Sequence, residues 1–260
     1  MTEFIQDVSL RTLYSTSGRV VCINGYKPSA MHRMTGNPGD LRLIEVWVED
    51  PLASRIVEQI SVELGLLGNL QTKQFGAIDN AFSVAATLEL DGADSNKNLV
   101  VIDGDRYRTM KDKLSRFNST LSGTGAQIQT MRKSALSWLE QLNPVIGELD
   151  GEAIPAASPV APIKPERYLL DAAMRAYQAG NANAYIAQFF NFAAENVFAD
   201  PDKSLIYNIH KHFNITIERV ELLLIDAAAT DSSWSAFTGQ VRDRLRQMAM
   251  ALNLDVNEGA

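Results

Sequence analysis

The apolar positions between residues 41 and 105 follow two alternating periods. Residues 41–49 and 98–102 are short apolar runs rich in β-forming side chains, which is typical of strands buried in a parallel sheet. Asp50-Pro51 directly after the first run is a helix-start signal, and it is followed by apolar residues at four-residue spacing, namely Leu52, Ile56, Ile60 and Leu64. The pattern predicts a strand joined directly to a helix that ends at Gly65.

The same alternation continues along the chain. Residues 70–75 predict a second strand, Asp79 begins a second helix, and residues 98–102 form a third strand. Strands alternating with helices are the signature of an α/β fold with a parallel sheet. We therefore expect a Rossmann-like parallel sheet flanked by helices, with further helix over 111–142 that is interrupted at 122–125.

Four segments organise the whole chain. Residues 1–40 predict a β-containing lead-in with a strand at 19–25, and 41–150 predict the α/β domain. Residues 151–165 contain four prolines, which excludes a regular helix or a central strand and predicts a connection. The pattern from 166 to 260 predicts a helical C-terminal subdomain with three breaks, near Gly180, 199–201 and 231–233.

Composition narrows the class of protein. The 260 residues are 46% hydrophobic and 21% charged, which fits a globular chain and excludes disordered or collagenous ones. A single cysteine, Cys22, excludes an intrachain disulfide, and with only three histidines it argues against a zinc site. The longest uncharged tract, 176–194, contains five amide side chains, so no membrane span is expected. The N-terminus has no signal-peptide pattern, and a cytoplasmic location is expected.

The charge balance is acidic. Asp and Glu total 31 against 24 Lys and Arg, a formal net charge of −7. This balance argues against a protein that holds nucleic acid mainly through its net charge.

Acidic side chains end two of the predicted strands. Glu49 ends the first, while Asp103 and Asp105 follow the third, and the carboxyl ends of parallel strands share one edge of a sheet. Convergent carboxylates repel one another unless a cation lies between them, and their hard oxygens favour Mg²⁺ or Mn²⁺. The pattern predicts a divalent-metal site, although Asp103-Gly104-Asp105 alone also fits an ordinary turn after a strand.

These two segments resemble a known fold. Residues 46–53 (VWVEDPLA) and 98–105 (NLVVIDGD) are similar to the two motifs of the Toprim fold, which topoisomerases, bacterial primases, recombination mediators and overcoming-lysogenization-defect (OLD) nucleases share. The first segment looks most like the OLD branch, whose Toprim domain usually follows an ABC-type ATPase. The sequence has no phosphate-binding loop of an ATPase, so the resemblance implies a separate ABC/AAA-type ATPase partner.

The resemblance implies roles for several residues. Glu49, Asp103 and Asp105 would be the catalytic metal ligands, and Asp50 or Glu45 would substitute for a second acid whose usual place is occupied by Ala53. Residues 161–170 are similar to a proline-rich segment leading into a helix after the Toprim core. That similarity implies Lys164 as a catalytic cation and Glu166 as an outer metal ligand, with Lys133 as the competing lysine.

Basic residues directly after the aspartates complete the prediction. Their spacing fits either a phosphate-binding patch or the solvated face of a helix. The residues are Arg106, Arg108, Lys111, Lys113 and Arg116, with Lys133 further along. The resemblance implies a metal-dependent nuclease acting on DNA or RNA in bacterial anti-phage defence, with homodimerisation left open. The alternative is a non-catalytic Toprim-like module that scaffolds a partner ATPase.

Overall fold

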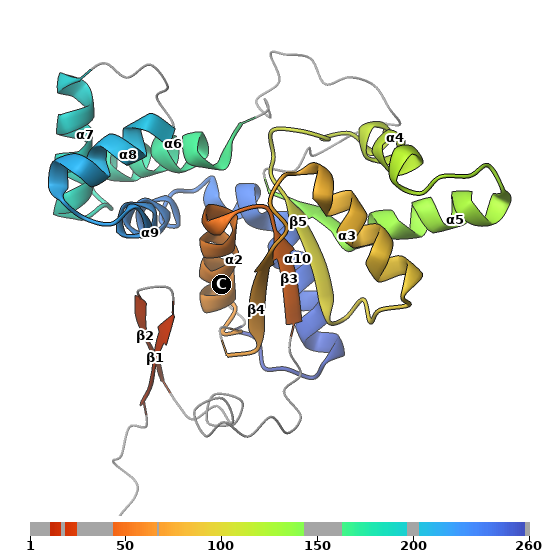
Figure 1. The fold of residues 1–260 in the computed structure, drawn as a ribbon. Helices are drawn as coiled ribbons and strands as arrows, with labels where there is room; N and C mark the ends of the chain where they lie inside the picture. The colour runs from red at the N-terminus through yellow and green to blue at the C-terminus, as the bar shows by residue number, and fades with distance from the viewer. Residues whose placement is uncertain are drawn as a thin grey trace, which may run out of the picture.

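A four-stranded parallel sheet lies at the centre of the protein (Figure 1). The computed structural model describes residues 11–16, 19–24, 44–66, 68–142, 163–196 and 203–257. The strands, in the spatial order β4-β3-β5-β6, are β3 (Ile44–Val48), β4 (Leu70–Gln74), β5 (Asn98–Ile102) and β6 (Leu139–Gln141). Helices flank this sheet, so the predicted α/β, Rossmann-like class is confirmed.

The first strand and helix form as the sequence predicts. Helix α2 (Pro51–Glu63) begins directly after β3, and Asp50 Oδ1 accepts a hydrogen bond of 2.9 Å from the Ala53 amide. This cap satisfies one of the free N–H groups at the helix start, and Pro51 has no N–H to satisfy. The helix ends at Glu63, and Gly65 follows with a φ of 74°, a conformation that suits glycine.

The strand order reverses between β3 and β5. From β3 the chain passes to β4 on one side and then crosses to β5 on the other side of β3. In such sheets, ligands bind beyond the carboxyl ends of the strands at this reversal. The last registered pair is Trp47 with Val100, and the same offset places Asp50 level with Asp103.

Helices cover both faces of the sheet. One face buries Val46, Val48 and Val101 in a cluster with α2 and α10 (Trp234–Ala251). The other face buries Val100 and Ile102, and it packs against α3 (Asp79–Leu90), α4 (Met110–Thr120) and α5 (Ala126–Ala135). In Figure 1, α2 lies to the left of the sheet and α3, α4 and α5 lie to the right. The arrangement is a three-layer α/β/α stack.

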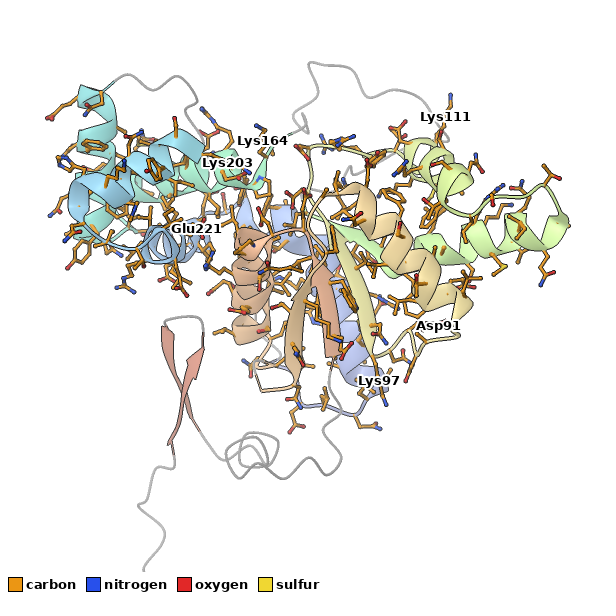
Figure 2. All side chains as sticks on the ribbon, viewed as in Figure 1. Asp91, Lys97, Lys111, Lys164, Lys203 and Glu221 are labelled. Carbon is orange, nitrogen blue, oxygen red and sulfur yellow. The ribbon has the colours of Figure 1, made fainter. Side chains whose placement is uncertain are left out.

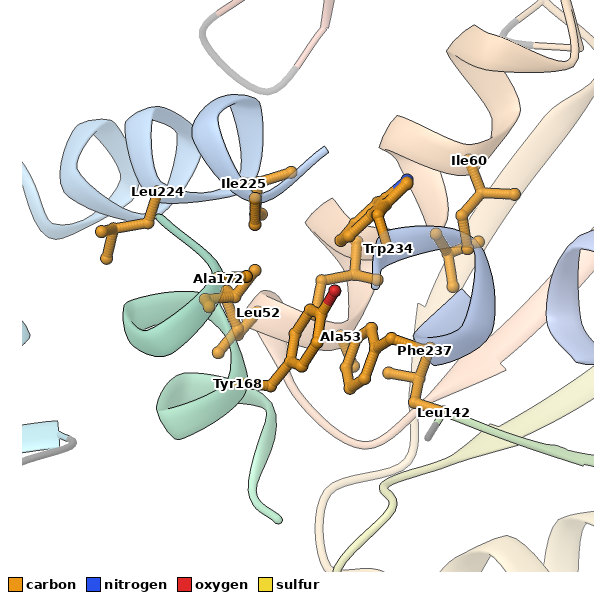
Figure 3. Packing of buried hydrophobic residues seen from close by; sticks show 14 of the residues in the cluster. Leu52, Ala53, Ile60, Leu142, Tyr168, Ala172, Leu224, Ile225, Trp234 and Phe237 are labelled. Atoms are coloured by element: carbon orange, nitrogen blue, oxygen red, sulfur yellow. The ribbon is translucent and has the colours of Figure 1, made fainter. Parts of the chain in front are cut away.

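The helical part of the chain packs onto one of these layers. It contains α6 (Pro165–Gln178), α7 (Ala184–Glu195), α8 (Lys203–Phe213), α9 (Ile217–Ala228) and α10. Figure 3 shows the packing where α2, α6, α9 and α10 meet, with the ring of Tyr168 stacked on that of Phe237 at 3.6 Å. Apolar residues of these helices form one cluster with the sheet, so the helices are anchored to it. Among the described residues, none of the helices is long and apolar enough to cross a membrane.

Two of the predicted helix breaks are confirmed, near Gly180 and at 231–233, while 199–201 lies outside the described residues. A further break at 214–216 was not predicted; there Asn214 has a φ of 50° and Thr216 caps α9. The hairpin of β1 (Arg11–Thr16) and β2 (Arg19–Asn24) confirms the strand predicted at 19–25. The prediction of helix up to 142 was wrong, because 139–141 form β6. A segment of three residues is too short to show a hydrophobic period, and its conformation is determined by pairing with β5.

Candidate functional site

Five carboxylates gather at the carboxyl ends of β3 and β5, and we call them the acidic edge: Glu49, Asp50, Asp103, Asp105 and Glu166. Burial, and after it the negative charges of the other four members, raise the pKa of Asp103 to about 8. The pKa of Glu49 is also raised, by burial and then by Asp50 and Asp105. The fold therefore brings together the acidic residues that the two motifs and the helix after the proline-rich segment supply.

Among the members of the acidic edge, Asp103 has the least favourable surroundings for an ionised carboxylate. Its Oδ1 atom is buried and has no hydrogen-bond partner among the described residues. Burying an ionised carboxylate without a partner is costly, and such groups bind a proton or a cation instead. An unpartnered buried oxygen among four other carboxylates is a place where a proton or a cation would be favourable.

The donor set fits a hard divalent cation. It consists of carboxylate oxygens, which Mg²⁺ and Mn²⁺ prefer, and no sulfur or imidazole is among the members. Within the described ranges, no three His, Cys, Asp or Glu side chains form a group that could hold an ion as they stand. Glu49 and Asp105 are only partly buried, so coordination would require their side chains to turn toward Asp103.

Three of the five acidic side chains are tied to the start of a helix. A backbone hydrogen bond from Ile78, at the start of α3, lowers the pKa of Glu49 against the effect of burial. Asp50 caps α2 with one carboxylate oxygen, and Glu166 lies in the first turn of α6. Helix N-termini stabilise negative charge, which explains how so many carboxylates are held together in one place.

Lys203 is the cation that the structure adds to the acidic edge. Its Nζ lies 3.0 Å from Glu166 Oε1, and hydrogen bonding to Glu166 raises the pKa of Lys203, with smaller contributions from Asp50 and Asp103. Its charge in turn lowers the pKa of Glu49. The Lys203 side chain is 65% exposed, so its ammonium group remains accessible to a ligand.

Sequence reasoning missed Lys203 because 100 residues separate it from Asp103 along the chain. One local signal could have pointed to it. Lys203 is the first residue of α8, where a positive charge opposes the helix dipole. A cation in that position needs a compensating partner, and Glu166 is that partner.

The two lysines proposed from the resemblance lie in different places. Lys164 is the exposed N-cap residue of α6, two positions before Glu166, and Figure 2 shows it near Lys203. Lys133 is exposed on α5, which packs on α3, on the opposite face of the sheet from α6 and α8. The lysine whose charge acts on the acidic edge is therefore Lys203.

A buried glutamine fixes the loop that carries the aspartates. Gln141 is 1% exposed on β6, and its Nε2 donates hydrogen bonds of 2.8 Å to the backbone oxygens of Asp103 and Arg106. Within the same loop, Tyr107 has a φ of 50° and donates a 2.5 Å hydrogen bond to Asp79 Oδ1. These contacts hold the loop at both ends, and Gln141 was not predicted as a site residue.

The basic residues after the aspartates divide into exposed and buried groups. Arg106 and Arg116 line an open pocket of ≈ 610 Å³ beside α4, together with Tyr107. Lys111 is exposed on the same helix (Figure 2), but Arg108 is only 8% exposed, and Lys113 lies close enough to Glu140 to lower its pKa. Arg106 and Lys111 are exposed and present charge to a ligand, Arg116 is partly buried and pairs with Asp79 at 3.3 Å, and Arg108 is buried.

A second pocket adjoins the acidic edge. This α6–α8 pocket has a volume of ≈ 320 Å³, and its lining includes Asp50, Glu166 and Lys203. At its far end, Arg55 of α2 forms an ion pair with Glu221 of α9. Burial raises the pKa of Glu221 to about 7, against the opposing effect of Arg55.

Comparison of the chain with protein-family models, curated proteins and solved structures gives no significant match. Glu49, Asp103 and Asp105 belong both to the acidic edge and to the two segments that resemble the Toprim motifs.

Proposed function

We propose that this protein is a divalent-metal-dependent nuclease of the Toprim type, similar to the OLD branch, that hydrolyses phosphodiester bonds of DNA or RNA. The observation that carries the proposal is the buried, unpartnered Oδ1 of Asp103, surrounded by four other carboxylates at the point where the strand order reverses. Mutual repulsion makes such a group unfavourable for folding, and binding a cation offsets that cost.

Glu49, Asp103 and Asp105 would hold a Mg²⁺ or Mn²⁺ ion, with Asp50 and Glu166 available as further ligands. A bound divalent ion supplies a water of lowered pKa and polarises the scissile phosphate. Because the pKa of Asp103 is about 8, its carboxyl retains a proton near neutral pH when no metal is bound. Metal affinity should therefore increase with pH.

Lys203 would balance charge on the substrate. Its exposed ammonium group, held at Glu166, can donate a hydrogen bond to a non-bridging oxygen of the scissile phosphate. Lys164 lies close enough along the chain to contribute at the same side of the site. Gln141 acts as a positioning residue, because it holds the backbone on both sides of Asp105.

The proposal includes partners and a setting. The resemblance suggests a cytoplasmic component of bacterial anti-phage defence that works with a separate ABC/AAA-type ATPase. Arg106, Lys111 and Arg116 would contact the phosphate backbone of the substrate beside the acidic edge.

One observation favours the alternative, a Toprim-like module that scaffolds a partner ATPase without catalysis. Ala53 stands where OLD enzymes often have a second acid, and it is 1% exposed in the core under α2. A carboxylate could not be added at this position without burial in that core. Without a second acid at position 53, only Asp50 and Glu166 remain as further ligands for a second ion.

Cleavage assays test the proposal. The chain is incubated with supercoiled plasmid, single-stranded DNA and single-stranded RNA in Mg²⁺, in Mn²⁺ and in chelator, alone and with a candidate ATPase. We expect divalent-metal-dependent cleavage that falls by about 10²-fold or more in Glu49→Gln. Asp91→Asn is the matched control, since Asp91 is exposed near the opposite end of the sheet (Figure 2).

Two outcomes would contradict the proposal. Cleavage that is equal in Glu49→Gln and the wild type would exclude the acidic edge as the catalytic site. No cleavage under any condition, together with tight binding to the ATPase, would support the scaffold.

A further inference from the structure

The α6–α8 pocket opens directly beside the acidic edge. Asp50, Glu166 and Lys203 line both, so a ligand in the pocket would be adjacent to a phosphate held at the edge. Its volume of ≈ 320 Å³ falls within the roughly 300–1,000 Å³ typical of small-molecule sites. Figure 2 shows Lys203 and Glu221, which both line the pocket, on the same side of the sheet.

Apolar side chains form much of the pocket wall. Ile206 is buried, whereas Tyr207 and Ile217 are 45% and 39% exposed, although large apolar residues usually bury most of their surface. Lys211 Nζ lies over the Tyr207 ring, 4.6 Å from its centroid, so a flat ring can stack only on the face of Tyr207 that Lys211 does not cover. Proteins that bind single-stranded nucleic acid stack bases on aromatic side chains in this way.

Charge in the pocket disfavours phosphate. Four carboxylates line it against two cations: Asp50, Glu166, Glu218 and Glu221 against Arg55 and Lys203. Both Arg55 and Lys203 are already paired with carboxylates of the same lining. Surplus carboxylate oxygens accept hydrogen bonds, so the fitting ligand is neutral, flat and rich in N–H donors.

We propose that the α6–α8 pocket receives the unstacked nucleobase next to the scissile phosphate. This inference rests on the proposed nuclease function. The phosphate would lie at the acidic edge beside Lys203, and the base of the same nucleotide would stack on Tyr207 with its donors toward Glu218, the lining glutamate that is not paired with Arg55 or Lys203. A base can enter only from a single strand or after extrusion from a duplex. Adenine, cytosine and guanine carry amino groups that can donate hydrogen bonds to the carboxylates.

A binding experiment tests the pocket independently of cleavage. Saturation-transfer NMR on the full chain measures binding of adenosine, cytidine, guanosine and uridine, which lack phosphate. We expect saturable binding that is weakest for uridine. Binding should be lost in Ile217→Trp, because the larger side chain fills part of the pocket, and it should be unchanged in Tyr185→Ala. Tyr185 is the matched control because it is an exposed tyrosine on α7 that does not line the pocket.

A cleavage experiment places the base relative to the cut. Oligonucleotides with one abasic site at successive positions are cleaved by the wild type and by Tyr207→Ala. We expect a roughly tenfold to hundredfold slower cut when the abasic site adjoins the scissile phosphate, and Tyr207→Ala should remove this difference. The proposal is overturned if nucleosides do not bind, if Ile217→Trp binds them as the wild type does, or if guanidinium compounds occupy the pocket instead. Nucleoside binding without any cleavage would retain the pocket and reject the nuclease.

Discussion

Asp103 and Lys203 illustrate how single residues set the chemistry of this protein. Asp103 is buried without a hydrogen-bond partner for Oδ1, and Lys203 is exposed but tied to a buried glutamate. A buried carboxylate without a partner and a cation at the N-terminus of a helix are both locally unfavourable for folding. Such local conflicts concentrate at functional sites, where a ligand offsets them.

Asp103→Asn should stabilise the metal-free protein. The pKa of Asp103 is about 8 in the folded state against 3.8 ordinarily, so its contribution to stability is lost as pH rises from about 4 through 8. Asparagine cannot ionise, and at pH 8 in chelator we expect a gain on the order of 2 kcal/mol, or roughly 4–8 °C in Tm. Thermal unfolding at pH 5 and pH 8 measures it, with Asp91→Asn as the control.

The gain should be smaller at pH 5, because the wild-type carboxyl is then protonated in the folded state. Loss of stability in Asp103→Asn at pH 8 would show that the carboxylate is a structural group and not a strained ligand.

Lys203→Ala should reduce kcat by about 10²- to 10³-fold with little change in KM, since its charge would act on the developing charge of the transition state. Lys97→Ala is the matched control: Lys97 is exposed before β5, near the opposite end of the sheet (Figure 2). Steady-state kinetics on a single-stranded oligonucleotide distinguish the two variants. Equal kcat in both would exclude Lys203 from the reaction.

Among the elements, strand β6 holds the loop that follows β5. The strand has three residues, and its Gln141 side chain binds two backbone oxygens of the loop after β5. The edge strand therefore positions the aspartates that follow the neighbouring strand.

Gln141→Leu should weaken metal binding without removing any ligand. The variant leaves two backbone oxygens without their donor, which we expect to destabilise the protein by about 1–3 kcal/mol and to loosen the Asp103–Arg106 loop. Calorimetric titration with Mn²⁺ should give a higher Kd, whereas Gln129→Leu on the exposed face of α5 should not change it. Unchanged Mn²⁺ affinity in Gln141→Leu would reject the positioning role.

Strong local signals made most elements predictable. The Asp50-Pro51 cap and the unbroken apolar run of β5 placed α2 and β5 correctly. The ends of β3 and β5 then pointed to Glu49 and Asp103 as candidate site residues. Gln141 could not be found in this way, and Lys203 only through its position at the first residue of α8, because the roles of both depend on contacts between distant segments. The short strand β6 was missed for the same reason, since it is defined by its partner β5.

At the scale of the whole molecule, the net charge of −7 is unevenly spread. Carboxylates gather at the acidic edge and in the α6–α8 pocket, whereas the exposed Arg106 lines the open pocket beside α4 and the exposed Lys111 lies on α4. An acidic chain can therefore still offer local positive charge to a phosphate backbone.

Arg106→Ala should weaken binding of long substrates without altering the chemistry at the acidic edge. Loss of one phosphate contact should reduce the slope of log affinity against log salt by about 1. Fluorescence anisotropy with labelled oligonucleotides over a salt series measures this slope. A slope identical to that of the wild type would place the nucleic acid away from Arg106.

The acidic edge should bind a divalent cation, and calorimetric titration of the full chain with Mn²⁺ at pH 8 measures this binding. The wild type and Asp91→Asn should bind Mn²⁺ saturably with equal affinity, and Asp103→Asn should lose this binding. Equal binding by Asp103→Asn and the wild type, or no saturable binding by either, would contradict the account.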